Sequence, residues 1–211
     1  MADHEGGTGV PQLTRRGAAT RARILQAAAQ LMYARGVAAT TLDDVRAVSG
    51  TSKSQLYRNF PDKEALVRDV IALQAQQLLA DQHQQLQRLR SLRGLERWRD
   101  AMVQSSTLRN GSYRCPLGSL ANELAEQSAE ARVALAEHFG TWESLLEQGL
   151  SRMVESGVLR GEADPAKLAT SLMAALQGGY LLAQVAHDAE PMGIALDMAI
   201  DHVKSYAADD A

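Results

Sequence analysis

One short segment, residues 41–63, concentrates side chains that can donate hydrogen bonds and positive charge to phosphate. Thr41 and Ser52 stand at the starts of two short predicted helices, whose free backbone N–H groups can bind an anion. Lys53 and Arg58 add positive charge to the same region. Side chains of these types hold the DNA backbone, whereas long side chains on an exposed helix read base edges. The segment therefore predicts a DNA-binding surface.

Two capping patterns and a tight turn define the helices that must position these residues. Thr41-Leu42-Asp43-Asp44 and Ser52-Lys53-Ser54-Gln55 each place a hydroxyl before a helix and an acceptor three residues later, which indicates capping boxes. Gly50 permits the turn, and Pro61 ends the second helix because it restricts Phe60. The pair is typical of a helix-turn-helix, whose second helix enters the major groove. The second pattern leaves two roles open for its glutamine, closing the box or reading a base.

From about Ala18 to Leu66 the chain resembles the DNA-binding domain of the TetR/AcrR family of regulators. The resemblance covers about a quarter of the chain. The residues that carry it are the first-helix pattern RILQAAAQLMYARG, then Thr40-Thr41, Asp44-Val45, Ser49-Gly50, Ser52-Lys53, Leu56-Tyr57 and Phe60-Pro61-Asp62-Lys63-Glu64-Ala65-Leu66.

This resemblance implies roles for individual residues. Thr41 and Tyr57 match positions that contact phosphates, although Tyr57 has core packing as an alternative, and Lys63 matches a lysine that touches the DNA backbone. Ser54 and Asn59 depart from the residues that the family often has, and Arg46 replaces a usually small residue and is expected to add a phosphate contact. The expected DNA-binding residues are Thr41, Arg46, Ser52, Lys53, Ser54, Gln55, Tyr57, Arg58 and Lys63.

Charge is distributed unevenly along the chain. Residues 11–68 carry ten Lys/Arg and four Asp/Glu, a net charge of +6, whereas residues 69–211 have a net charge of −7. A basic module joined to an acidic one suggests that only the first meets a polyanion, with chance clustering as the alternative. Arg15 and Arg16 could reach a minor groove as a basic arm or belong to a solvated tail.

Composition predicts a soluble, helical, cytoplasmic protein. Aromatic residues make up only 4% of the 211 residues, and the abundance of alanine and leucine favours helices over strands. The single cysteine excludes an internal disulfide framework and fits a reducing cytosol. We find no signal peptide and no apolar run near the roughly 20 residues that a membrane span needs.

Apolar periodicity and capping residues predict an all-α fold of about nine helices without strands. The expected domains are a disordered arm (1–16), a helix-turn-helix domain (17–64) and a helical ligand-binding and dimerisation domain (65–211). The glutamine-rich stretch 74–87 is expected to be a solvated connector. The helices are expected at about 18–35, 41–49, 52–60, 63–89, 95–107, 117–126, 129–155, 165–187 and 191–206, with a loop at 109–112.

The larger domain resembles the LmrA/YxaF-like branch of the family in three places: Arg114–Leu120, Phe139 with Trp142, and Leu176–Tyr180. This resemblance implies a dimer and control of efflux or catabolic genes by aromatic or flavonoid-type compounds. Small residues on the last two predicted helices indicate a dimer face, although they could instead pack within one chain. The expected interface residues are Ala174, Ala175, Gly178, Gly179, Leu182, Ala183, Val185, Met198 and Val203.

Methionines and aromatic residues of the larger domain suit a small hydrophobic or aromatic effector. Singly, each has core packing as an alternative, and Cys115, which follows Arg114, has thiol sensing as another. The five histidines are scattered, and we expect neither a metal nor a cofactor. The expected ligand-binding residues are Trp98, Met102, Cys115, Phe139, Trp142, Met153, Met173, Gln177 and Tyr180.

The sequence thus predicts a homodimeric repressor that binds a palindromic DNA operator and is released by a small hydrophobic or aromatic effector. An activator or an effector-independent regulator is the first alternative. A helical carrier or enzyme with a vestigial DNA module is the second, although phosphate-binding loops and nucleophile motifs typical of enzymes are absent from the sequence. The sequence does not identify the effector, the operator or the regulated genes.

Overall fold

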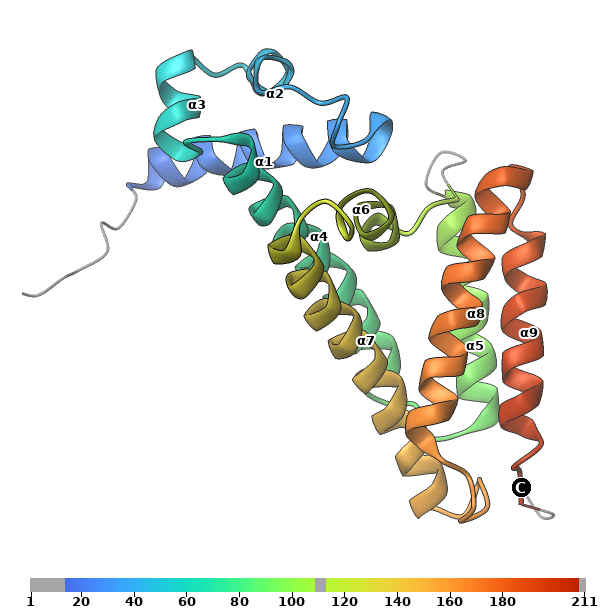
Figure 1. The fold of residues 1–211 in the computed structure, drawn as a ribbon. Helices are drawn as coiled ribbons and strands as arrows, with labels where there is room; N and C mark the ends of the chain where they lie inside the picture. The colour runs from blue at the N-terminus through green and yellow to red at the C-terminus, as the bar shows by residue number, and fades with distance from the viewer. Residues whose placement is uncertain (1–13, 109–112, 209–211) are drawn as a thin grey trace, which may run out of the picture. The chain divides into compact units, whose positions relative to one another are not determined.

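The computed structural model describes residues 14–108 and 113–208. Within those ranges the chain forms nine α-helices and no named β-strand, which confirms the predicted all-α fold (Figure 1). One isolated antiparallel bridge joins Leu159 to Ala207. The helices are α1 (Arg15–Arg35), α2 (Leu42–Ser49), α3 (Lys53–Asn59), α4 (Lys63–Leu86), α5 (Leu92–Leu108), α6 (Pro116–Leu124), α7 (Ala129–Glu155), α8 (Pro165–Ala186) and α9 (Glu190–Lys204).

Helix α1 begins before its expected start, inside the segment predicted to be a disordered arm. The side chain of Thr14 accepts a hydrogen bond from the N–H of Gly17 and so caps the helix. Arg15 and Arg16 are therefore helical, which corrects that part of the prediction. The rest of the expected arm and the expected loop at 109–112 lie outside the described residues.

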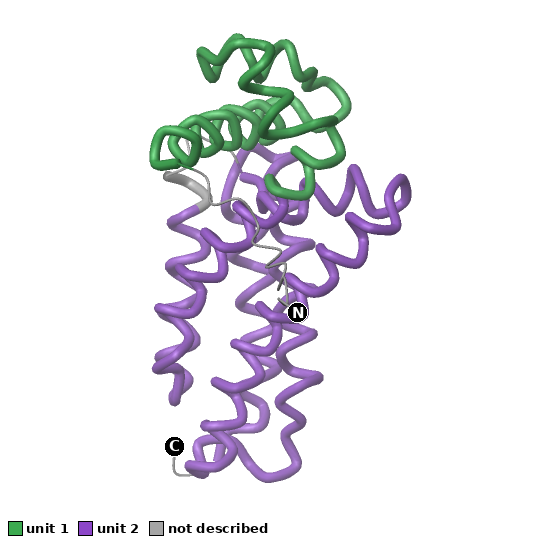
Figure 2. The backbone as a smooth tube through the Cα atoms, turned by 90° about the vertical axis from the view of Figure 1, so that its left-hand side faces the viewer, with its two compact units in different colours: residues 1–70 green, residues 71–211 purple. Residues whose placement is uncertain are grey.

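Contacts divide the chain into two compact units, with the division between Val70 and Ile71 (Figure 2). The sequence placed the boundary earlier, after residue 64. In the structure the first two turns of α4 belong to the first unit, and their apolar residues Leu66 and Val70 are buried.

The core of the first unit forms where α1 packs against both α2 and α3. Ile24, Ala28 and Met32 recur at helical spacing on α1, and all three are buried. Val45 of α2 is fully buried, and Leu56 of α3 is 1% exposed. Because α3 buries this one stripe, its other residues remain available at the surface.

In the second unit, α8 packs against both α7 and α9, while α5 packs against α9 and α6 against α7. Gly179 permits a close approach of α8 and α9, since a Cβ at this position would lie 2.8 Å from the Cα of Met192. Arg152 of α7 donates hydrogen bonds to the carbonyl oxygens of Leu86 at 2.9 Å and Leu89 at 3.2 Å. The guanidinium thereby satisfies carbonyl groups at the end of α4.

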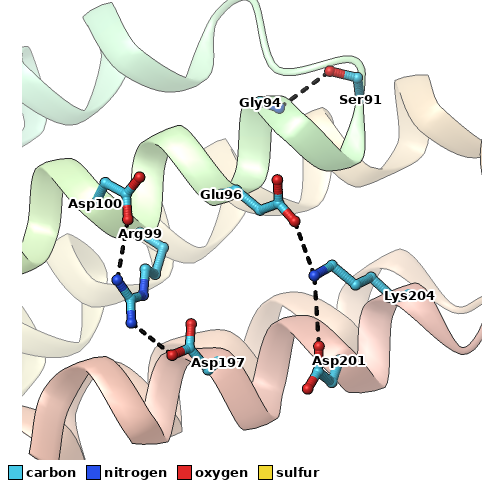
Figure 3. A network of polar contacts seen from close by, with 8 residues as sticks. All are labelled: Ser91, Gly94, Glu96, Arg99, Asp100, Asp197, Asp201 and Lys204. Carbon is cyan, nitrogen blue, oxygen red and sulfur yellow. Dashed lines mark hydrogen bonds and ion pairs between the residues drawn. The ribbon is translucent and has the colours of Figure 1, made fainter.

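Ion pairs join α5 to α9 (Figure 3). Arg99 donates hydrogen bonds to Asp197 at 2.6 Å and Asp100 at 3.0 Å, and Lys204 lies 2.9 Å from Glu96. Burial opposes the charge of Arg99, but its hydrogen bonds with Asp197 and Asp100 outweigh burial and raise the pKa of Arg99. These charges fix one side of α9 within the chain.

Helix α8 is long and apolar enough, by length and composition, to cross a membrane. This finding corrects the expectation that no segment meets that criterion. Core helices of soluble proteins often have the same composition, and α8 packs against two helices of its own unit, with 39% of its most apolar window buried. Core packing accounts for the buried part of this apolar surface, whereas Leu181, Leu182 and Val185 of α8 are exposed.

Candidate nucleic-acid interface

A reciprocal capping box begins α2. Thr41 Oγ1 accepts a hydrogen bond from the N–H of Asp44 at 3.1 Å, and Asp44 Oδ2 accepts one from the N–H of Thr41 at 2.9 Å. The hydroxyl of Thr41 and then its N–H lower the pKa of Asp44 below the ordinary value of 3.8, and Arg35 lowers it further. After α2, Gly50 adopts the left-handed conformation with φ 63° and starts the turn into α3.

A second capping box begins α3 and involves a residue whose role the sequence left open. Gln55 Oε1 accepts a hydrogen bond from the N–H of Ser52 at 2.9 Å, and Ser52 Oγ accepts one from the N–H of Gln55 at 3.2 Å. A bidentate contact with adenine needs both an acceptor and a donor. The cap occupies one lone pair of Oε1 and restrains the carboxamide, so Gln55 is less available for a bidentate contact with a base.

The solvent-facing side of α3 carries most of the predicted contacts. Tyr57 is 45% exposed and is therefore not a core residue. Lys53 Nζ lies 5.9 Å from the centroid of that ring. Ser54 and Arg58 are also exposed, and Arg58 forms no ion pair with any residue in the described ranges. These four side chains make up a polar, cationic surface on one short helix.

The two cations expected beside this surface already have partners within the chain. Lys63 Nζ donates a hydrogen bond at 3.4 Å to the carbonyl oxygen of Ala38, before α2 begins. An ammonium group has three donors, so Lys63 can keep this contact and still bind a phosphate. Arg46 Nε lies 3.2 Å from Asp43 Oδ1, but both side chains are largely exposed, and such pairs exchange partners readily.

Arg21 of α1, which the sequence analysis did not select, holds the end of α3. Its Nη1 donates a hydrogen bond at 2.7 Å to the carbonyl oxygen of Asn59, and its Nη2 pairs with Asp69 of α4. The guanidinium also lies 4.3 Å from the ring centroid of Phe60. Arg21 therefore sets the position of α3, although a spacing pattern within the predicted motif could not show it.

In the second unit, several of the predicted ligand-binding residues surround a small cavity. Met102, Trp142 and Tyr180 line a space of about 50 Å³ together with Gln82 and Pro116. Trp98 does not line this space. Its indole N–H donates a hydrogen bond to the side chain of Gln82, which does line it.

The remaining predicted ligand-binding residues have other positions. Cys115 is buried and caps α6, where its Sγ accepts a hydrogen bond from the N–H of Gly118 at 3.3 Å. Gln177 lies next to Gly118, and its Nε2 is buried without a hydrogen-bond partner among the residues that the structure describes. Three further predicted residues do not line the cavity: the buried Met153 and Met173 and the partly buried Phe139. Helical periodicity identifies the buried face of a helix, but it does not show which part of that face lies beside a cavity.

Gln82 is an exception within the glutamine-rich stretch, which the sequence predicted to be a solvated connector. Its side chain is 3% exposed, and its Oε1 accepts hydrogen bonds from Trp98 Nε1 at 2.9 Å and Trp142 Nε1 at 3.0 Å. Its Nε2 donates to Met102 Sδ at 3.6 Å. The neighbouring Gln84 is exposed, so residues of one type in one stretch have opposite environments.

The predicted dimer face divides into an exposed and a buried set. Three of the predicted residues are buried: Gly179, Ala183 and Val203. They lie on the sides of α8 and α9 that face the core, so they pack within the chain, as the alternative interpretation held. Ala175 is partly buried. The exposed predicted residues are Ala174, Gly178, Leu182, Val185 and Met198. Leu181 and Ile194, which the sequence did not single out, are also exposed, at 55% and 63%.

Known proteins match both units of the chain. The pattern of bacterial regulatory proteins of the tetR family matches residues 24–70, and the pattern described as transcriptional regulator LmrA/YxaF-like, C-terminal domain, matches residues 91–198. An uncharacterised HTH-type transcriptional regulator in the lacX 3′ region of Lactococcus lactis subsp. lactis is 27% identical over 180 residues, which are 80% of this chain and 85% of that protein.

Solved structures agree with these matches. The structure of SmeT, the repressor of the Stenotrophomonas maltophilia multidrug efflux pump SmeDEF, has a TM-score of 0.66 and 26% identity, covering 92% of this chain and 93% of SmeT. A TetR-family regulator from Cytophaga hutchinsonii has a TM-score of 0.80 and 20% identity, covering 94% of this chain and all of that one, and shows the shared fold.

Two helices with exposed cationic residues, and these matches, define a DNA-binding transcription regulator of the helix-turn-helix class. The chain belongs to the TetR family, and its C-terminal domain is LmrA/YxaF-like. It is a transcriptional regulator and not an enzyme.

Proposed function

We propose that the protein is a homodimeric repressor that binds a palindromic operator and releases it when a small hydrophobic or aromatic effector binds. The observation that carries the proposal is the exposed surface of α3, held by a capping box at its start and by Arg21 at its end. Thr41, Tyr57 and Lys63 bind phosphates, and Ser54 and Arg58 reach base edges. The repressor acts in the cytoplasm, where its DNA is.

The exposed apolar face of α8 and α9 supports the dimer. Leu181, Leu182 and Val185 of α8 are 55%, 57% and 76% exposed, and Ile194 and Met198 of α9 are 63% and 68% exposed. A cluster of large apolar side chains on one surface marks an interface, since exposed apolar area is otherwise costly. A two-fold dimer would present two α3 helices to half-sites on a palindrome.

The size of the cavity determines how an effector could enter the second unit. A space of about 50 Å³ is far smaller than the roughly 300–1,000 Å³ of pockets that hold drug-sized ligands. A ligand must therefore enlarge it and displace side chains of α4, α5 or α7. Asp81, Leu78 and Pro116 also border a more open hollow of about 450 Å³, which offers an entrance.

Helix α4 provides the link between effector and DNA, because it carries both Lys63 and Gln82. An effector releases DNA only if it binds the conformation with low DNA affinity more tightly than the other. Differences of about 1–3 kcal/mol are typical of such coupling. The similarity to SmeT, the repressor of an efflux pump, supports repression as the action of this protein on transcription.

Footprinting and transcription in vitro on the DNA upstream of the gene test the proposal. We expect a protected segment with two-fold symmetry that overlaps a promoter, and lower transcription when protein is added. Ser54→Ala and Arg58→Ala should weaken protection of particular base pairs, and Arg132→Ala, an exposed change in the second unit, is the control. Protection upstream of the promoter with increased transcription would instead identify an activator.

A further inference from the structure

The two tryptophans of the chain donate hydrogen bonds to the same buried oxygen atom. Trp98 Nε1 lies 2.9 Å and Trp142 Nε1 lies 3.0 Å from Gln82 Oε1. An indole N–H can only donate, and a buried donor without an acceptor is costly. Gln82 therefore supplies the acceptor for both indole groups, which come from α5 and α7.

This acceptor borders the cavity. Gln82, Trp142 and Met102 all line the space of about 50 Å³, and Gln82 reaches it from α4 by a flexible side chain. The bond from Gln82 Nε2 to Met102 Sδ, at 3.6 Å, is with a weak acceptor and is lost at little cost. Gln82 is thus the member of the group most easily moved by an incoming molecule.

We propose that the indole N–H groups of Trp98 and Trp142 are recognition donors for a carbonyl oxygen of the effector, and that the Gln82 carboxamide takes the place of this oxygen in the ligand-free protein. The inference rests on the proposed effector-released repressor and specifies the chemical group, a carbonyl, by which the protein selects its ligand. A compact apolar compound with one carbonyl group displaces Gln82 and keeps both indole bonds. A hydrocarbon of the same shape displaces Gln82 and leaves two buried donors unpaired.

The exchange also explains how ligand binding reaches α4. When the carbonyl oxygen of the ligand replaces Gln82 Oε1, the side-chain bonds that join α4 to Trp98 of α5 and Trp142 of α7 are lost. The indole donors stay paired, so the protein loses a link between helices without leaving either indole N–H unsatisfied. Each unmet buried donor weakens binding by about tenfold or more, so ketones should be favoured over matched hydrocarbons by at least that factor.

Two matched pairs of probes test the inference: acetophenone with 2-phenylpropene, and camphenilone with camphene. In each pair a C=O replaces a C=CH₂ on an identical body. The probes are titrated into the full-length ¹⁵N-labelled protein, whose spectrum has two indole N–H signals because the chain has two tryptophans. We expect at least one ketone to bind, to shift both indole signals, and to bind at least tenfold more tightly than its hydrocarbon partner.

A variant sharpens the comparison. Gln82→Ala removes the internal acceptor, so the ketone should bind more tightly than to the wild-type protein, and the ketone should still bind at least tenfold more tightly than its hydrocarbon partner. Gln84→Ala, an exposed glutamine on the same helix, is the matched control and should leave both affinities unchanged. The wild-type titration decides the question even if Gln82→Ala is unfolded.

The inference is overturned if no ketone binds at millimolar concentration, if a hydrocarbon binds as tightly as its ketone, or if ketone binding leaves the indole signals in place. DNA affinity is measured in a separate titration. Ketone binding with shifted indole signals and unchanged DNA affinity would support the recognition site and contradict the effector-released repressor, so the two failures are distinguishable.

Discussion

The guanidinium of Arg21 lies over the ring of Phe60, 4.3 Å from its centroid, and at the same time donates a hydrogen bond to the carbonyl oxygen of Asn59. Phe60 and Asn59 follow one another at the end of α3. Arg21 of α1 thus holds the last turn of α3 by its charge, its planar face and its hydrogen-bond donors.

Replacing Arg21 should therefore lower the free energy of unfolding. Arg21→Met keeps most of the apolar volume but loses the charge and the donors, and we expect the free energy of unfolding to fall by about 1–2 kcal/mol. Urea unfolding measures this change, and Arg23→Met, an exposed change on the same helix, is the control. Equal stability of the two variants would show that Arg21 does not hold α3.

The capping box of α2 predicts a pH dependence. Because Thr41 lowers the pKa of Asp44, the ionised carboxylate stabilises the folded state above its unfolded pKa, near 3.8, and this stabilisation is lost as pH falls through the lower folded pKa. Asp44→Asn should therefore remove part of the acid sensitivity of unfolding below about pH 4. Thermal unfolding from pH 2.5 to 7 measures it, with Asp188→Asn, an exposed aspartate of the second unit, as the control. Parallel pH profiles of Asp44→Asn and the wild-type protein would contradict the role of Asp44.

Salt dependence separates phosphate contacts from structural roles. If Lys53 and Lys63 each neutralise one phosphate, Lys53→Met and Lys63→Met should each reduce the slope of log affinity against log salt by about 0.9. Fluorescence anisotropy at several salt concentrations measures the slope, and Arg132→Met in the second unit should leave it unchanged. A variant that lowers affinity with the wild-type slope would have lost structure instead of a phosphate contact.

The exposed face of α8 and α9 predicts the oligomeric state. Val185→Glu and Met198→Glu place charges among exposed apolar residues and should convert a dimer into a monomer without unfolding it. Sedimentation velocity measures the mass. Val133→Glu on α7 is the matched control, since Val133 is 56% exposed and lies outside this face. A wild-type monomer, or a Val185→Glu dimer, would place the interface elsewhere.

Glycines with different surroundings give a test of the α8–α9 packing. A Cβ at Gly179 would lie 2.8 Å from the Cα of Met192, so Gly179→Ala must separate the helices and should cost about 1–3 kcal/mol. At Gly140 in α7 a Cβ would meet nothing within 4 Å, and Gly140→Ala should stabilise by about 0.4–1 kcal/mol. Opposite shifts in thermal unfolding are expected, and shifts of the same sign would contradict the packing.

The sequence predicted features that depend on local spacing. Both capping boxes, at Thr41 and Ser52, form as their spacing requires, and helical periodicity predicted the nine helices that residues 14–108 and 113–208 form. Contacts between distant parts of the chain escaped it. Arg21 and Asn59 are 38 positions apart, and Gln82 and Trp142 are 60 positions apart, so no local pattern joins them.

The direction of each side chain explains the departures at the predicted dimer face and in the glutamine-rich stretch. Small residues on α8 look alike in the sequence, yet Gly178 is exposed and Gly179 lies against Met192, because adjacent helical positions point about 100° apart. Gln82 and Gln84 differ in burial because helical positions two apart point about 200° apart. Composition describes a segment, whereas burial depends on the direction of each side chain.

Whether the exposed face of α3 holds DNA is tested most directly by binding measurements. Fluorescence anisotropy of a labelled fragment from the DNA upstream of the gene gives the affinity of the protein for that DNA. The wild-type protein should bind at low salt, and Tyr57→Ala should bind about tenfold more weakly, because a contact with phosphate is lost. Val133→Ala, an equally exposed position in the second unit, should bind like the wild-type protein. No binding at low salt, or equal affinity of Tyr57→Ala and the wild-type protein, would contradict the account.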